Sequence, residues 1–174
     1  GSPKFDLDRA PTRAEAVTIL VRLLGAEEAA TQKTIATPFT DVPAWAKPYV
    51  GYAYSKGYTN GVDAKHFGPN NTVSAAQFLT FLLRALGYSS VTNTDLSDTL
   101  DRAVSAGLIN SKESAALAKV SFLRAELVYL SFRSLDATVS GTMDTLSDTL
   151  IAKGVFTSAE AREGRALVSA RRLG

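Results

Sequence analysis

Arg13 is a candidate functional residue, because the helix that begins beside it does not require an arginine at this position. It lies between Thr12 and Glu15, whose T-x-x-E spacing predicts a capping box at the start of a helix. A cation so close to a helix N-terminus is unfavourable by roughly a few tenths of a kcal/mol. An arginine can instead grip a carboxylate through two parallel hydrogen bonds, each worth about 1.5–3 kcal/mol. From these residues alone Arg13 is expected to pair with a neighbouring acid such as Asp41 or to reach solvent, and binding of a ligand carboxylate is the alternative.

Asp41, Trp45 and Gly61 form a second group of candidates, with the residue types that bind sugars. The indole of Trp45, the only tryptophan, can cover the C–H face of a sugar and donate its N–H. Asp41 can accept hydrogen bonds from sugar hydroxyls, and Gly61 can let the backbone approach a ligand. Each has a structural alternative: core packing for Trp45, capping a turn for Asp41, and a turn with positive φ for Gly61.

The segment that carries Arg13 is repeated along the chain. Residues 73–87 match 11–25, with Ser74 and Gln77 in place of Thr12 and Glu15. Residues 122–136 form a third copy. Apolar residues fall on one helical face in each copy, and they are Val17, Leu20, Val21 and Leu24 in the first, Leu79, Leu82, Leu83 and Leu86 in the second, and Val128, Phe132 and Leu135 in the third. The chain is therefore a repeat protein.

A different helical half-repeat lies between these copies. Its copies are 45–61, 98–110 and 148–156, each with a glycine where the helix should end. Pro48 predicts that the first of these helices begins near Lys47, because proline fits the first turn. Short strands are allowed near 38–42 and 67–72, but the predicted fold is mainly α.

The alternating halves predict a repeat domain over 1–156 and a basic C-terminal helix over 157–174. Within the domain, 5–30 is the second half of a repeat, 39–88 is a complete repeat, 95–136 is degenerate and 142–156 is a terminal half-repeat. Either the first repeat is truncated, or the final half-repeat packs with the opening helix and completes a third pair. The second alternative leaves no orphan apolar face and is favoured.

Composition excludes several functions. A net charge of +2 over 174 residues does not favour nucleic acid, and no apolar run reaches the ~20 residues of a membrane span. Cysteine is absent, which removes disulfides and thiol chemistry. His66 is the lone histidine and has no evident catalytic or metal-binding partners. We expect no enzyme activity, no metal and no cofactor.

The run from Phe39 to Gly87, FTDVPAWAKPYVGYAYSKGYTNGVDAKHFGPNNTVSAAQFLTFLLRALG, resembles an S-layer homology repeat. The matching features are F-x-D-V, the tryptophan with alanine, two glycines, F-x-P and the helix start that reads T-R-A-E at residues 12–15. The resemblance implies a pseudo-threefold helical bundle. It also implies an exported cell-surface protein, with its signal peptide outside this sequence, whose inter-repeat grooves bind secondary cell-wall polymers that often end in pyruvylated sugars.

Under this resemblance the candidate ligand-binding residues are Arg13, Asp41, Trp45, Gly61 and Arg124. Cap and arginine vary independently among the copies, since the second copy has Ala75 in place of the arginine and the third keeps Arg124 without a capping side chain. Val91 and Asp95 replace Asp41 and Trp45 in the third copy, so its groove should bind weakly. The sequence does not show whether Arg13 or Arg124 completes the groove.

The predicted function is non-catalytic anchoring to an anionic, pyruvylated cell-wall glycan through an inter-repeat groove. The alternative is a helical scaffold that binds another protein or assembles with itself, for which exposed tyrosines such as Tyr49, Tyr52 and Tyr58 would be suited. In the basic C-terminal helix, Arg162, Arg165, Arg171 and Arg172 either face solvent or contact the anionic polymer.

Overall fold

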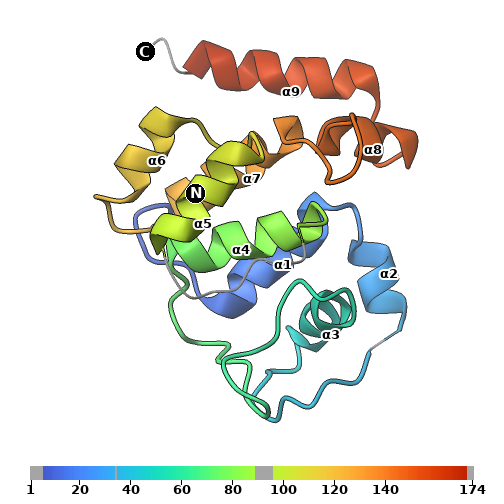
Figure 1. The fold of residues 1–174 in the computed structure, drawn as a ribbon. Helices are drawn as coiled ribbons and strands as arrows, with labels where there is room; N and C mark the ends of the chain where they lie inside the picture. Colours follow the sequence, from blue (N-terminus) through green and yellow to red (C-terminus); the bar gives the residue numbers. More distant parts are fainter. Residues whose placement is uncertain (1–5, 34, 89–95, 172–174) are drawn as a thin grey trace.

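The structure is a computed structural model that describes residues 6–33, 35–88 and 96–171, and it confirms the mainly α fold (Figure 1). The helices are α1 (Arg13–Leu23), α2 (Glu27–Gln32), α3 (Lys47–Ser55), α4 (Ala75–Ala85), α5 (Leu96–Ser105), α6 (Ser111–Leu117), α7 (Arg124–Arg133) with the 3-10 turn η1 (Ser134–Asp136), α8 (Leu146–Ala152) and α9 (Ser158–Arg171). Within the described residues there is no strand, and extended pairing is limited to isolated bridges between Thr12 and Thr72 and between Thr138 and Thr145.

The helix starts lie where the sequence places them. Thr12 and Glu15 form a reciprocal capping box on α1, and Ser74 and Gln77 form the same box on α4. Pro48 lies in the first turn of α3, where its missing N–H costs no helical hydrogen bond. These local signals depend only on neighbouring residues, which is why the sequence suffices to predict them.

Two short helices were not predicted from the sequence. In α6, Asn110 accepts from the backbone N–H groups of Lys112 and Glu113, while Glu113 accepts from Asn110, so an N-x-x-E capping box was readable there. No side chain caps α2, which is held instead by contacts with α1 and α3.

The hydroxyl of Tyr49 donates to Glu27 at 2.6 Å, and Glu27 also accepts from Arg22. Tyr49 is therefore buried, and the exposure expected of it is wrong.

Three helices, α1, α4 and α7, contact one another pairwise and form an inner ring. Each contributes fully buried side chains to the core: Val17, Leu20 and Val21 from α1, Phe78, Leu79 and Leu82 from α4, and Leu127 and Leu130 from α7. These three helices are the copies of the segment that carries Arg13 at its start, so the repeat in the sequence becomes a threefold arrangement in space.

An outer helix packs beside each inner helix. Helix α3 contacts α1, α5 contacts α4, and α8 contacts η1 at the end of α7 (Figure 1). The terminal half-repeat thus supplies the third outer helix. It also reaches the end of α1, because a Cβ added to Gly25 would lie 2.4 Å from a methyl carbon of Val155.

Helix α9 runs along the end of the molecule opposite α3 (Figure 1). Thr157 and Glu160 cap it, since the backbone N–H of Thr157 donates to the Glu160 carboxylate and the Thr157 hydroxyl accepts from the Glu160 N–H. Arg165 donates to Asp136 at 2.8 Å and ties the helix to η1.

Two helical glycines give a paired test of packing. A Cβ on Gly51 of α3 would lie 2.5 Å from the carbonyl oxygen of Ile35, whereas one on Gly164 of α9 would meet nothing within 4 Å. Alanine favours a helix over glycine by roughly 0.5–1 kcal/mol. Gly164→Ala should therefore leave the free energy of unfolding unchanged or raise it, while Gly51→Ala should lower it by more than about 1 kcal/mol. Urea unfolding followed by circular dichroism measures both, and equal effects would contradict the close backbone approach.

Candidate functional site

The starts of the inner helices are joined by loops, and we call these junctions seams. In the first seam, Arg13 and Ala14 of α1 donate backbone hydrogen bonds to the carbonyls of Asn71 and Pro69 at 2.9 and 3.1 Å. In the second seam, Arg124 and Ala125 of α7 donate to Arg9 and Leu7 at 2.9 and 3.1 Å. The third seam lies between the start of α4 and residues 117–122. In the described chain, no backbone hydrogen bond joins those two parts.

Arg13 and Asp41 meet at the backbone of Phe67 in the first seam. Nε of Arg13 donates to the Phe67 carbonyl at 3.0 Å. The Asp41 carboxylate accepts from the N–H groups of Phe67 and Gly68, both at 2.8 Å. The peptide unit between Phe67 and Gly68 is therefore held at its oxygen by one side chain and at its nitrogen by the other.

Arg13 lies inside the protein, with only 1% of its surface exposed. Its guanidinium carbon is 5.1 Å from the ring centre of Phe67 and 5.3 Å from that of Phe81, distances at which cation–π attraction operates. Burial lowers the pKa of Arg13, and the nearby positive charge of Arg84 lowers it further. Among the described residues no acid forms an ion pair with Arg13. Arg13 and Asp41 do not pair directly, as one alternative expected, but each binds the backbone of Phe67.

Asp41 is partly exposed at the edge of this arrangement. Desolvation raises the pKa of its carboxyl group, but the hydrogen bonds from Phe67 and Gly68 lower it, and the net pKa lies below the usual value. The carboxylate is thus charged at neutral pH and keeps further acceptor sites for a ligand.

Trp45 and Gly61 are the remaining candidates of the same repeat, and Trp45 follows Asp41 by four residues in the chain. Trp45 precedes α3 and is 55% exposed, so its indole is open to a ligand. Gly61 has φ of +78°. A Cβ there would lie 2.5 Å from the Phe39 ring and 2.7 Å from the carbonyl of His66, so the backbone turn and the close packing both require glycine.

Arg124 lies at the second seam and takes a different partner. It donates to Glu15 at 3.0 Å, and its side chain is 24% exposed. Arg9 grips the same carboxylate with both terminal nitrogens, and Thr12 donates its backbone N–H to it at 2.9 Å. The structure therefore brings Arg13, and not Arg124, to Asp41. The role of Phe67 and the convergence on Glu15 were not predicted, because no local pattern encodes them.

An alignment of the half-repeats identifies the residues at the other two seams that correspond to Asp41 and Trp45. Superposing Gly57 on Gly154 puts Thr138 and Thr142 at the positions of Asp41 and Trp45 beside α7. The corresponding residues for the third seam, Val91 and Asp95, lie outside the described residues. That seam has Ala75 in place of the arginine, and a cavity of about 550 Å³ opens there. Only the first seam combines arginine, aspartate and tryptophan in this sequence.

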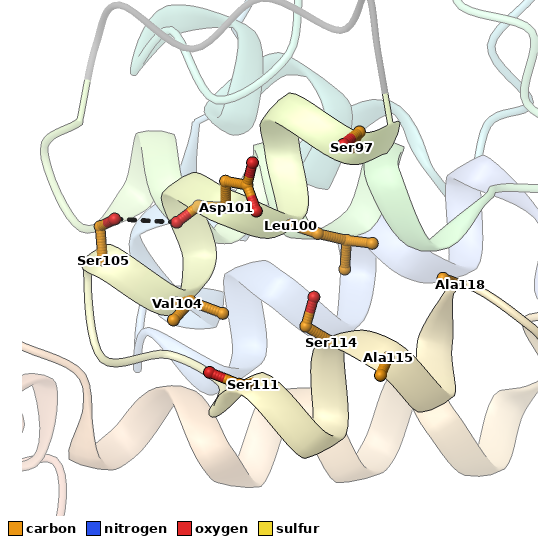
Figure 2. Close-up of a pocket in the computed structure, with 9 residues that line it drawn as sticks. All are labelled: Ser97, Leu100, Asp101, Val104, Ser105, Ser111, Ser114, Ala115 and Ala118. Carbon is orange, nitrogen blue, oxygen red and sulfur yellow. Dashed lines mark hydrogen bonds between the residues drawn. The ribbon is translucent and has the colours of Figure 1, made fainter.

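Another groove, of about 720 Å³, lies between α5 and α6 (Figure 2). Leu100 and Val104 line it together with Asp101 and several serines, and the Ser105 hydroxyl donates to the Asp101 carbonyl at 2.9 Å. None of the five candidate residues lines this groove. His66 lies in an exposed loop, where its ring contacts Asp63.

The described residues contain no group of three or more histidines and acids placed to hold a metal ion. The same part of the chain contains no helix with the length and hydrophobicity that a membrane span requires.

A three-helix ring with outer helices and loop-closed seams is the architecture expected of an S-layer homology domain. The family model of the S-layer homology domain matches residues 38–79, which contain Asp41, Trp45 and Gly61. Residues 38–79 thus match the S-layer homology domain, which confirms the resemblance read from the sequence for that part of the chain.

Similar proteins come from several bacteria. A cell surface protein of Thermoanaerobacter kivui is 40% identical over 94 residues, which cover 52% of this chain and 12% of that protein. A surface layer protein of Brevibacillus choshinensis is 37% identical over 90 residues, covering 51% and 8%. A middle cell wall protein of Brevibacillus brevis is 34% identical over 90 residues, also covering 51% and 8%. The chain therefore matches only a small part of the length of these relatives.

The two arginines should differ in what they contribute to stability. Arg13→Ala removes a buried side chain and leaves the Phe67 carbonyl without its donor, so it should cost about 2–4 kcal/mol. Arg124→Ala removes a partly exposed ion pair and should cost about 1 kcal/mol or less. Urea unfolding of the two variants beside the parent measures the difference. A smaller loss for Arg13→Ala than for Arg124→Ala would contradict the assignment of Arg13 to the core.

The charge of Glu15 should make stability depend on acid pH. The hydrogen bonds from Arg9 lower the pKa of Glu15 most, and burial opposes them, leaving a pKa of about 2 instead of 4.5. A lowered pKa stabilises the folded state above the unfolded value, and this contribution is lost as the pH falls from 4.5 towards 2. Unfolding free energies measured from about pH 6 to about pH 3 should fall less steeply for Glu15→Gln than for the parent. Parallel curves would contradict the ion pairs.

Proposed function

We propose that this chain is a non-catalytic module that anchors a surface protein to an anionic, pyruvylated secondary cell-wall polymer outside the cell. The family match at 38–79 and the names of the relatives support cell-surface anchoring. The observation that carries the choice of site is the exposed indole of Trp45, four residues after Asp41, whose carboxylate holds the Phe67 backbone together with Arg13. The proposed division remains a repeat domain over 1–156 followed by the basic helix over 157–174.

In this proposal Trp45 covers the C–H face of a sugar, and Asp41 accepts hydrogen bonds from its hydroxyls. Gly61 allows the backbone to lie close to the ligand. Two acceptor positions of Asp41 are engaged by backbone N–H groups, which fix its orientation before the ligand arrives. A rigid carboxylate loses little entropy when it binds.

Arg13 has two proposed roles. The first is to order the Phe67 segment, through its hydrogen bond to the Phe67 carbonyl and its contact with the Phe67 ring. The second proposed role is to attract a ligand carboxylate towards the first seam, because no acid of the described chain forms an ion pair with Arg13. Arg124, at the second seam, is the other candidate ligand residue, but its guanidinium already donates to Glu15, so we propose that it takes part only where that carboxylate is displaced.

Trp45→Ala is the sharpest test, because an exposed side chain can be removed without loss of core packing. Its matched control is Met143→Ala, which removes another exposed side chain, 97% accessible, from a loop outside the first seam. Co-sedimentation with cell walls should weaken by about tenfold or more for Trp45→Ala, equivalent to ~1.4 kcal/mol, and stay unchanged for Met143→Ala. Circular dichroism spectra of both variants should match that of the parent, which is the control for folding.

The same assay on walls stripped of secondary polymer identifies the partner. Binding that disappears with the polymer supports glycan anchoring. Binding that survives on stripped walls, or that both variants retain in full, would overturn it and favour the alternative, a scaffold for protein partners or self-assembly. Arg13→Ala is a poor first test, since its loss of binding would be confounded by loss of stability.

A further inference from the structure

Glu15 is the most heavily engaged acid at the inner ring. Arg9 holds both of its oxygens, Arg124 donates to one at 3.0 Å, and the Thr12 N–H donates to the other at 2.9 Å. Two guanidiniums and a helix N-terminal N–H converging on one carboxylate make a receptor for a carboxylate. In this structure the protein fills that receptor with its own side chain.

The ring order shows that this arrangement belongs to one seam only. Glu15 sits on α1 and faces Arg124 at the start of α7. Glu15 is the third residue of its helix, and Arg124 is the first residue of the neighbouring inner helix. At the other two junctions of the ring, the corresponding pairs are Gln77 of α4 with Arg13 of α1, and Glu126 of α7 with Ala75 of α4. The acid of the first pair is therefore replaced by a neutral amide in the second pair. In the third pair the acid is present, but alanine replaces the arginine.

We propose that Glu15 determines which seam accepts an external carboxylate: it occupies the guanidiniums of Arg9 and Arg124 at the second seam, and a neutral residue at its position opens that seam to a carboxylate ligand. The inference rests on the proposed function for the class of ligand alone. Glu15 acts as an internal competitor, so the second seam is closed although it retains its arginine. At the first seam the corresponding residue, Gln77, carries no charge that could compete for Arg13.

Glu15→Gln separates charge from capping. In α4 the Gln77 side chain accepts from the Ser74 N–H at 3.1 Å and completes a capping box, so glutamine can serve the same purpose on α1. The matched control is Glu126→Gln, because Glu126 also accepts from the backbone N–H at its helix start, at 2.8 Å, but is matched with Ala75 in the ring. Both variants lose one negative charge and keep their helix start.

The experiment is a titration with sodium pyruvate at constant ionic strength, followed through the Nε–H NMR signals of Arg9 and Arg124. The Glu15→Gln variant should show saturable shifts of both signals, with a dissociation constant at least about tenfold below any value for the parent or for Glu126→Gln. The gain should vanish in the double variant Glu15→Gln, Arg124→Gln. The indole signal of Trp45 reports separately on the glycan site proposed above, so failure there does not alter the result at the second seam.

Three results would overturn the proposal. Shifts of Arg9 and Arg124 in the parent equal to those of a folded Glu15→Gln would mean that Glu15 does not compete. A folded Glu15→Gln without saturable shifts would mean that the two arginines form no receptor. An equal gain in Glu126→Gln would assign the effect to net charge.

Discussion

The peptide unit between Phe67 and Gly68 is the point on which the first seam depends. A backbone amide that leaves water must find partners, and this one finds them in side chains from two distant parts of the chain, Arg13 from the start of α1 and Asp41 from the turn before α3. The two charges do not pair directly. Each stabilises one end of the peptide dipole, and the seam is closed further by the bonds from α1 to Asn71 and Pro69.

The third seam lacks the arginine and is built differently. Ala75 stands at the place of Arg13 and Arg124, and the cavity of about 550 Å³ is lined by Ala75 and its neighbours. A guanidinium with its three methylenes would occupy part of that space. Two seams with arginine are thus closed by equivalent backbone hydrogen bonds, and the seam without it has none in the described chain.

Much of this fold could be predicted from sequence because its signals are local. Capping boxes at Thr12 and Ser74, proline in the first turn of α3, and the apolar face of α4 each involve residues within a few positions of one another. The resemblance to the S-layer homology family added the threefold arrangement. The short helix α2 was missed because it has no capping side chain and is held by Tyr49, far away in the chain.

The site was less predictable, for a physical reason. Whether Arg13 meets a ligand, an acid or the core depends on which loop folds over it, and that loop is more than fifty residues away, at Phe67. The spacing of T-R-A-E shows that the arginine is unnecessary for capping, but it cannot show that the guanidinium lies between two aromatic rings. Likewise, the pairing of Glu15 with Arg124 joins residues separated by 109 positions.

The buried position of Arg13 also affects how evolution can treat this site. Under the proposed function Arg13 would both support the fold and serve recognition, so selection for stability would retain it even where binding had been lost. Trp45, which is exposed and outside the core, would be under no such restraint. Among proteins built like this one, the tryptophan would then record the loss of binding more faithfully than the motif arginine does.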